Sequence, residues 1–322
     1  MPETLHGLFT RVATDIESRV RGQHEVINRL LMAVLADGHV LLEGPPGVAK
    51  TRTALLMAHA FHGSFARVQF TPDLLPADLT GTNVYDPAEH RFHFHRGPLF
   101  HDFILADEIN RAPAKVQAAL LEAMAERQIT AGGTTHSLDE SFFVIATQNP
   151  FEEEGTYELP VAQLDRFALC IRIGYPPAQA EAEVLDLVFA ERRDGNPYHP
   201  PMGELTRISR ADLRAARREV LDVHRSDPVR DYIVRLVAAT RDTTARQGAI
   251  AHAVSPRGTL ALAHLASARA WLNGRDHVLP DDVQALCRDV LAHRIGLSDR
   301  AIMARTDPDT IIADIVSRVP VS

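Results

Sequence analysis

Short apolar runs alternate with stretches of helical periodicity through the first half of the chain. Five runs are predominantly apolar, as is typical of parallel strands buried on both faces of a sheet: 39–43, 66–70, 103–107, 142–147 and 168–173. Apolar residues with helical spacing follow the first run at 50–61 and recur at 113–127. The alternation predicts an α/β domain in which helices cover a five-stranded parallel sheet in three layers.

Turn residues interrupt this alternation twice. Segment 81–98 contains the turn dipeptides Asp86-Pro87 and Gly97-Pro98 around alternating residues at 91–96, which predicts a β-hairpin in or near a helix. A second hairpin is expected between 127 and 142, with its turn at Gly132-Gly133.

The pattern changes after residue 178. Helical periodicity dominates from 179 onward, and amphipathic helices are predicted at 210–223, 228–242, 256–272 and 280–293. A segment rich in Pro and Gly at 194–203 is expected to be a connecting loop. We therefore predict two domains, an α/β core at 1–178 and an all-helical domain at 179–322.

Length and composition are typical of a soluble globular protein. The 322 residues suffice for two domains, with 45% apolar and 24% charged residues. The longest apolar runs, such as 142–146, are far too short to span a bilayer. The first ten residues lack the basic segment and long apolar stretch of a signal peptide, so we expect a cytoplasmic location and no membrane insertion. The net charge of −8 argues against a nucleic-acid-binding role.

The cysteines and histidines form no recognisable disulfide or metal pattern. Cys170 and Cys287 cannot build a disulfide framework, and the apolar surroundings of Cys170 predict a buried free thiol. His90, His93 and His95 are close in the chain, but no Cys or carboxylate completes a zinc set. We interpret these histidines as polar side chains on one face of a hairpin.

The basic residues are unevenly divided between lysine and arginine. Of the 34 lysine and arginine residues, only Lys50 and Lys115 are lysine. Lysine is a compact point charge on a slim stem, whereas arginine is a wide planar fork. A lysine that persists against this bias is expected where that shape matters, and a narrow phosphate-binding loop is such a place. Chance retention is the alternative, more so for Lys115.

A glycine-rich loop containing Lys50 connects the strand at 39–43 to the helix at 50–61. Such a loop aims several backbone N–H groups at one point, and the helix N-terminus adds a dipole that favours anions. Lys50 would contact the β- and γ-phosphates of a nucleotide, and the Thr51 hydroxyl would bind Mg²⁺. Ala49 stands where the strict motif has glycine, and we expect tolerance because right-handed backbone angles are easy for alanine. The predicted nucleotide-binding residues here are Gly44, Pro45, Pro46, Gly47, Val48, Ala49, Lys50, Thr51 and Arg52. The alternative is a Pro/Gly turn that happens to precede a helix.

Two acids end the apolar strand at 103–107. The carboxyl edge of a parallel sheet is where ligands bind. Asp107 would hold Mg²⁺ through water, and Glu108 would orient and deprotonate the attacking water. An isolated Asp-Glu pair is more often an ordinary strand end, but its position about sixty residues after a phosphate loop favours the catalytic interpretation.

Further motifs follow in a fixed order along the chain. Asp107-Glu108-Ile109-Asn110-Arg111-Ala112-Pro113 leads into Lys115, Gln117 and Leu120-Leu121-Glu122-Ala123-Met124. With Gly22-Gln23, 69–76 (QFTPDLLP), 146–150 (ATQNP), 159–167 (LPVAQLDRF) and Ser255-Pro256-Arg257, this pattern resembles the MoxR family of AAA+ ATPases. The resemblance runs from about residue 20 to about residue 295.

The resemblance implies a role for each matched residue. Gly22 and Gln23 would pack near adenine, and Asn149 would hydrogen-bond the attacking water or the γ-phosphate. Arg166 matches the arginine finger, which would stabilise the transition state at the ATP of the neighbouring subunit. Arg257 matches sensor 2, and whether it acts on its own subunit's nucleotide or a neighbour's stays open. The alternatives are a turn-forming role for Asn149 and an ion pair to an acid such as Asp165 for Arg166.

The resemblance also implies an assembly and a biological role. An arginine finger used on a neighbour implies a homo-oligomeric ring, usually a hexamer, with Arg111 and Lys115 at the subunit interface. The hairpin at 81–98 would be a helix-2 insert, the second hairpin would precede sensor 1, and the helical domain would be a lid. Similar proteins are chaperone-like Mg²⁺-dependent ATPases that assemble or activate protein complexes, often with a von Willebrand factor A domain partner, which here would be a separate protein. The alternatives are a DNA-remodelling motor, which the charge of −8 disfavours, and a non-hydrolysing nucleotide-binding scaffold, which Glu108, Asn149 and Arg166 together disfavour.

Overall fold

A five-stranded parallel sheet forms the centre of the first half of the protein. The structure is a computed structural model that describes residues 4–149, 155–193, 205–242 and 248–321. The strand order is β2-β5-β8-β1-β9, and every neighbouring pair is parallel. The strands are β1 (Val40–Glu43), β2 (Phe65–Gln69), β5 (Phe103–Asp107), β8 (Phe143–Gln148) and β9 (Leu169–Arg172). All five predicted strands are confirmed, each to within about one residue at either end.

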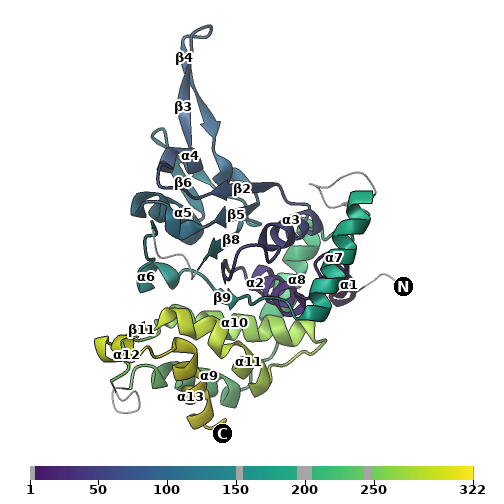
Figure 1. The fold of residues 1–322 in the computed structure, drawn as a ribbon, viewed down its shortest axis with the longest axis vertical. Coiled ribbons are helices and arrows are strands. Elements are labelled where there is room, and N and C mark those ends of the chain that lie inside the picture. The colour runs from purple at the N-terminus through teal and green to yellow at the C-terminus, as the bar shows by residue number, and fades with distance from the viewer. Residues whose placement is uncertain (1–3, 150–154, 194–204, 243–247, 322) are drawn as a thin grey trace.

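Helices cover both faces of this sheet, so the predicted three-layer architecture is confirmed (Figure 1). Alternate side chains of the strands enter two separate apolar clusters: Leu105 and Ile145 belong to one, and Ile104 and Val144 to the other. The first cluster contains residues of α1 (Leu5–Arg19), α2 (His24–Leu35) and α3 (Lys50–Ala60), and the second contains residues of α5 (Ala114–Glu126). Strands buried on both faces explain their predominantly apolar sequences.

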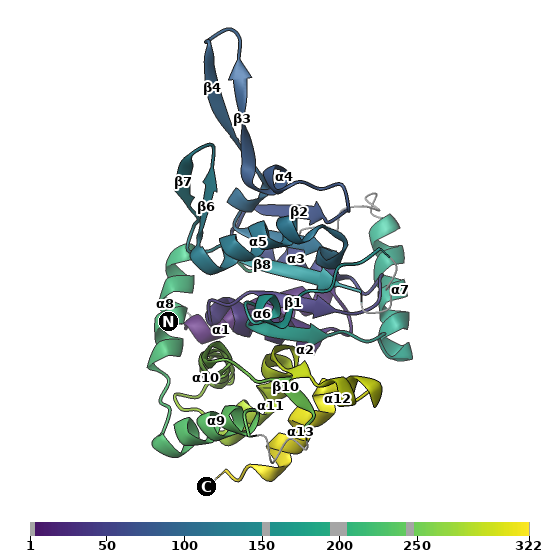
Figure 2. The ribbon, with the colours of Figure 1, turned by 90° about the vertical axis from the view of Figure 1, so that its left-hand side faces the viewer.

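Two β-hairpins rise from the same end of the core (Figure 2). The longer joins β3 (Gly81–Asp86) to β4 (Arg91–Arg96) directly after α4 (Pro76–Thr80), and the shorter joins β6 (Gln128–Ala131) to β7 (Thr134–Ser137). Gly132 and Gly133 both have positive φ, 60° and 78°, which matches the tight turn predicted for the shorter hairpin. The hairpins pack side by side, because the rings of Phe94 and His136 stack with centroids 4.7 Å apart.

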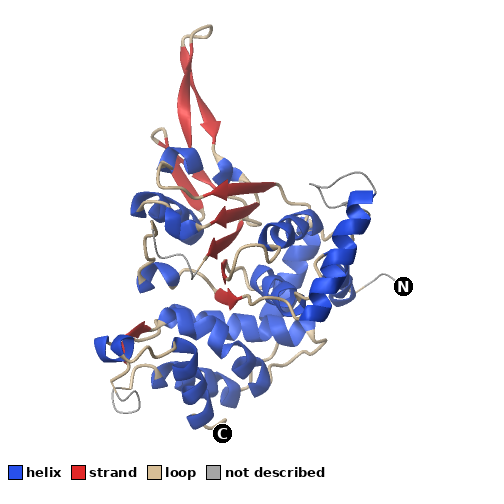
Figure 3. Ribbon diagram, viewed as in Figure 1, coloured by secondary structure: helices blue, strands red, loops and turns tan. Residues whose placement is uncertain are grey.

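The second half is mostly helical, as predicted (Figure 3). The helices expected in the last 120 residues correspond to α8 (Arg210–Asp222), α9 (Asp227–Ala239), α10 (Pro256–Leu272) and α11 (Pro280–Leu291). The expected all-helical character is wrong in one detail, since β10 (Ile250–His252) pairs with β11 (Gly296–Leu297). The further elements here are α7 (Ala178–Arg193), α12 (Asp299–Met303) and α13 (Pro308–Arg318).

The two halves share one core. The apolar cluster beneath α1–α3 continues into α8–α11, so the predicted boundary at residue 178 stays a prediction. The expected loop at 194–203 lies outside the described residues. Cys170 and Cys287 are buried free thiols, as expected for Cys170. Among the described residues, none of the helices has the length and apolarity needed to cross a bilayer.

Candidate active site

The glycine-rich loop joins β1 to α3 at the carboxyl edge of the sheet. Gly44 lies against β9, where an added Cβ atom would be 2.5 Å from the carbonyl oxygen of Ile173. Gly47 has φ +84° and open space around it. Glycine is therefore required at position 44 for close approach and at position 47 for backbone conformation.

Ala49 adopts the left-handed conformation, with φ 58° and ψ 21°, directly before the first residue of α3. Our expectation that alanine is tolerated through right-handed backbone angles is therefore wrong. The position needs the conformation that glycine supplies freely, and alanine adopts it at a cost of about 1–2 kcal/mol.

The ammonium group of Lys50 turns back onto its own loop. Its Nζ atom donates to the Gly44 carbonyl oxygen at 2.8 Å. Lys50 is the first residue of α3, and Thr51 and Arg52 follow in the first turn, each half-buried. The lysine charge and the N-terminus of α3 therefore face the same loop, as an anion site requires.

The Gly22-Gln23 segment lies beside this loop, and its predicted role near adenine stays a prediction. Gln23 Nε2 donates to the carbonyl oxygen of Val48 at 2.5 Å. Gly22 has φ +75°, and an added Cβ atom would be 2.8 Å from the Cβ atom of Ala180 in α7. The start of α2 is thus hydrogen-bonded to the phosphate loop, and α7 packs against Gly22.

Asp107 ends β5 and Glu108 directly follows it, at the same sheet edge as the loop. Asp107 is mostly buried and accepts a hydrogen bond from the Thr147 hydroxyl at 2.6 Å. Its other carboxylate oxygen pairs with Arg67 Nη2 at 2.7 Å. Glu108 has positive φ (57°), and its carboxylate accepts from Gln69 Nε2 at 2.7 Å and lies 3.2 Å from Arg111 Nε. Both acids are therefore held in fixed orientations by neighbouring strands.

Asn149 completes the carboxyl edge. It directly follows β8, the strand between β1 and β5, and its side chain is buried. The sheet order thus brings together the residues after β1, β5 and β8: Lys50, Thr51, Asp107, Glu108 and Asn149.

Arg166 and Arg257 lie at the opposite edge of the sheet. They line one pocket together with residues that precede β1, such as Asp37, and residues that precede β9, such as Asp165. Arg257 Nη1 is 3.9 Å from Asp165 Oδ2, and Arg166 Nη1 donates to the carbonyl oxygen of Leu121 in α5 at 2.6 Å. A four-residue parallel strand spans about 13 Å, so these arginines are well separated from the phosphate loop of their own chain.

Arg111 and Lys115, the two residues predicted to lie at a subunit interface, follow Glu108 in the chain. Arg111 belongs to the short helix that follows Glu108 and pairs with that carboxylate, whereas Lys115 is exposed in the first turn of α5. Arg111 therefore lies in its own subunit's acidic cluster, and the interface role of both residues stays a prediction.

The residues Arg67, Gln69 and Thr147 orient the acids, and the sequence did not single them out for this role. Arg67 and Gln69 point to one face of β2, and Gln69 is paired in register with Asp107 of β5. The sequence showed two polar residues at alternate positions near the end of a strand. They can be linked to the acids only when β2 is known to lie beside β5.

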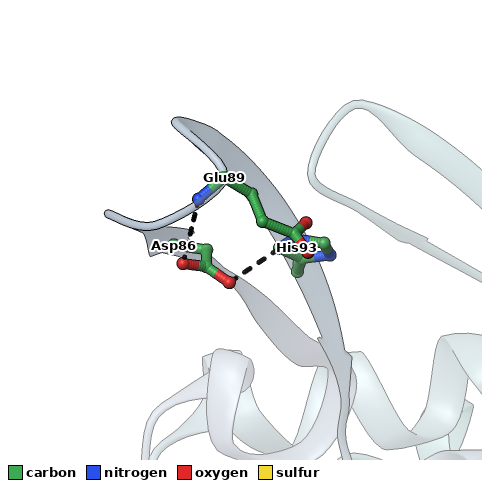
Figure 4. Close-up of side chains that lie close together, drawn as sticks. All are labelled: Asp86, Glu89 and His93. Carbon is green, nitrogen blue, oxygen red and sulfur yellow. Dashed lines mark hydrogen bonds and ion pairs between the residues drawn. The ribbon is translucent and has the colours of Figure 1, made fainter.

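The long hairpin contains a further cluster of polar residues (Figure 4). Asp86, Glu89 and His93 place one ligand atom each within 4.8 Å of one another, so two carboxylates do lie beside one of the histidines for which the sequence indicated no completing Cys or carboxylate. The guanidinium of Arg91 contacts the same Glu89 oxygen and the same His93 nitrogen. We therefore describe the group as an exposed ion-pair network around Arg91.

Comparisons with known proteins agree with this geometry. A family model described as "ATPase family associated with various cellular activities (AAA)" matches residues 39–169, and an AAA lid domain matches residues 242–315. The chain is 39% identical to Chaperone MoxR1 of Mycobacterium tuberculosis, over 96% of this chain and 81% of that protein. It is 35% identical to Protein MoxR of Paracoccus denitrificans, over 91% of this chain and 90% of that protein. The chain belongs to the MoxR family of AAA+ ATPases.

Membership of the MoxR family extends to the three-dimensional fold. A crystal structure of a candidate ATPase from Cytophaga hutchinsonii superposes with a TM-score of 0.89 at 40% identity, over 98% of this chain and 95% of that one. The MoxR family resemblance, the α/β core with a five-stranded parallel sheet and the helical lid region are thereby confirmed. The roles assigned to individual residues remain predictions.

Proposed function

We propose that this MoxR family protein hydrolyses ATP at a site shared between two subunits of a homo-oligomeric ring, and that Glu108 activates the water. The observation that carries the proposal is the convergence of Lys50, Glu108 and Asn149 at one edge of the sheet. In this arrangement Lys50 leaves the Gly44 carbonyl and binds the β- and γ-phosphates, with the backbone N–H groups of 44–51 around them. Gln69 and Arg111 orient Glu108 for proton abstraction, and Asn149 positions the water.

The residues present fit a bound magnesium ion. The Thr51 hydroxyl and the Asp107 carboxylate are hard oxygen donors, which Mg²⁺ prefers, and both lie at the same sheet edge. When bound, Mg²⁺ neutralises charge on the phosphate oxygens. Arg67 now pairs with the Asp107 oxygen, but it is half-exposed and can move into solvent when the carboxylate exchanges partners.

The positions of Arg166 and Arg257 favour action on a neighbouring subunit. Both line one pocket at the amino edge of the sheet, across the strands from their own phosphate loop. Neither side chain spans that distance, whereas a cyclic ring places this edge beside the next subunit's loop. We therefore assign Arg257, like Arg166, to the neighbour's nucleotide.

The biological role we propose is the chaperone-like assembly or activation of a protein complex in the cytoplasm. Its support is the similarity to a protein named Chaperone MoxR1. A ring, usually a hexamer, would act on a client complex together with a separate partner that bears a von Willebrand factor A domain. Hydrolysis would shift the helical lid against the α/β core and so transmit force.

The Glu108→Gln variant tests both parts of this proposal. It removes the general base and keeps the shape and the contacts of the side chain, so ATP binding should persist while phosphate release stops. Normal turnover by this variant would refute the role of Glu108. With ATP bound, affinity capture by the trapped variant should recover a protein complex, and recovery of duplex DNA instead would favour the DNA-remodelling alternative.

A further inference from the structure

The guanidinium of Arg294 is buried at the junction between the lid and the segment that carries Arg166. Arg294 ends the short 3-10 helix Ala292–Arg294, which follows α11, and is 2% exposed. Its five N–H groups have five acceptors: Asp165 Oδ1 and the carbonyl oxygens of Asp165, Phe167, Ala168 and Val290. Four of these acceptors lie in residues 165–168, which we call the finger segment.

The finger segment has two further attachments to the lid. The hydroxyl of Ser255, the N-cap of α10, donates to the second carboxylate oxygen of Asp165 at 2.8 Å. His293 Nε2 donates to the carbonyl oxygen of Phe167 at 3.1 Å. Because α10 and the end of α11 both hold this segment, the lid and the backbone around Arg166 form one unit.

The buried guanidinium of Arg294 holds the backbone on both sides of Arg166. Burial lowers the pKa of Arg294 to about 10, and the Asp165 carboxylate opposes that shift, so the guanidinium is charged at neutral pH. Lysine would offer three donors from a single point and could not reach acceptors on both sides of Arg166. The planar fork therefore fixes the backbone before and after the finger residue at the same time.

We propose that Arg294 is a positioning residue that holds Arg166 in its catalytic orientation and transmits movement of the lid to it. This inference rests on the proposed role of Arg166 at the neighbour's nucleotide. A rotation of the lid would carry the finger segment with it. The nucleotide state of one subunit would therefore change the orientation of its Arg166 at the nucleotide of the next subunit. Arg294 also borders the pocket that Arg166 and Arg257 line, but it is only 2% exposed and its N–H groups are used by the finger segment and α11, so it would act through Arg166 rather than on a nucleotide directly.

The test compares the variants Arg294→Lys and Asp165→Asn with Arg166→Ala. Misplacement of a reacting group by about 1 Å can cost about 100-fold, so we expect kcat to fall by about 10- to 100-fold in Arg294→Lys. The Kd for ATP should change less than about twofold, because the phosphate loop lies at the other sheet edge. Ser255→Ala removes one attachment of the finger segment and leaves Asp165 paired with Arg294, so it keeps the test available if Arg294→Lys does not fold. Asp165→Asn removes the counter-ion of Arg294 and is the more severe change.

Arg29 provides a matched control. Its Nε atom pairs with Asp289 at 2.7 Å, and it links α2 of the core to α11 of the lid without touching the finger segment. Arg29→Lys should therefore lower the melting temperature to a similar degree and leave kcat within about twofold. An equal fall of kcat in Arg29→Lys would overturn the proposal, since general loosening of the lid would then explain both variants.

A double variant separates positioning from an independent effect. If Arg294 acts only through Arg166, adding Arg294→Lys to Arg166→Ala should lower kcat no further, and additive losses would overturn the proposal. Wild-type kcat in Arg294→Lys alongside a strongly reduced but measurable kcat in Arg166→Ala would overturn this inference and leave the proposed function intact. Full activity of Arg166→Ala would overturn both.

Discussion

His39 makes the stability of this protein depend on pH, in a way that the structure allows us to quantify. The residue directly precedes β1 and is 5% exposed. Its Nδ1 atom accepts from the backbone N–H of Val144 at 3.1 Å, and its Nε2 atom donates to the carbonyl oxygen of Met124 at 3.3 Å. A neutral imidazole satisfies both contacts, whereas a protonated one would lose the first. Burial, assisted by the charge of Arg127, lowers the pKa of His39 from its ordinary 6.5 to about 3.

The sign and the size of the effect follow from linkage. Because the folded-state pKa is depressed, the unfolded chain binds the proton first as pH falls, and stability present above pH 6.5 is lost between about pH 6.5 and about pH 3. Between pH 7 and pH 5 the loss attributable to His39 is about 2 kcal/mol, since each pH unit below the unfolded pKa costs about 1.4 kcal/mol. Buried His293 has its pKa lowered in the same direction and adds to the total loss.

The assay is urea unfolding of the wild type and of His39→Gln at pH 7 and at pH 5. The glutamine variant should be less stable at pH 7, because one amide cannot replace both ring contacts. Its loss of stability from pH 7 to pH 5 should be smaller than that of the wild type by about 2 kcal/mol. His293 is present in both proteins, so the difference isolates His39. Equal losses in the two proteins would refute the reasoning.

Two further predictions concern the phosphate loop. Lys50→Ala should abolish ATP binding in a nucleotide titration, because the loop loses the cation that we propose binds the β- and γ-phosphates. Unchanged affinity would refute the assignment of the site. Ala49→Gly should raise the free energy of unfolding by about 0.5–1 kcal/mol. The strain removed from the left-handed alanine is larger than the stability lost through the added conformational entropy of glycine in the unfolded chain. A decrease measured by urea unfolding would show that Ala49 is not strained.

The sequence predicted those parts of the fold whose signal is local. Apolar runs between turn residues located all five sheet strands, and Gly132-Gly133 located the turn of the shorter hairpin. The helices α1 and α2 were not predicted. The pairing of β10 with β11 was also missed, since both strands are very short and lie far apart in the chain.

The candidate site was less accessible to sequence reasoning because its contacts join distant segments. The resemblance indicated Asp107 and Glu108, but the ion pair of Asp107 with Arg67 depends on β2 lying beside β5. The motif shows that alanine replaces glycine at position 49, but it does not show that this residue adopts the left-handed conformation. The sequence also could not locate Arg257 relative to the sheet, because that position is set by how the lid packs on the finger segment.

The placement of the phosphate loop and the two arginines at opposite sheet edges has a consequence for how the protein is measured. Each folded chain carries its phosphate loop at one sheet edge and Arg166 and Arg257 at the other, so under the proposed function these arginines would act on a neighbour's nucleotide. We therefore expect ATP to bind equally well at any protein concentration, while turnover per chain rises with concentration until assembly saturates. Dilution alone would then lower the turnover per chain. The cell could therefore regulate ATP hydrolysis through the abundance of this protein.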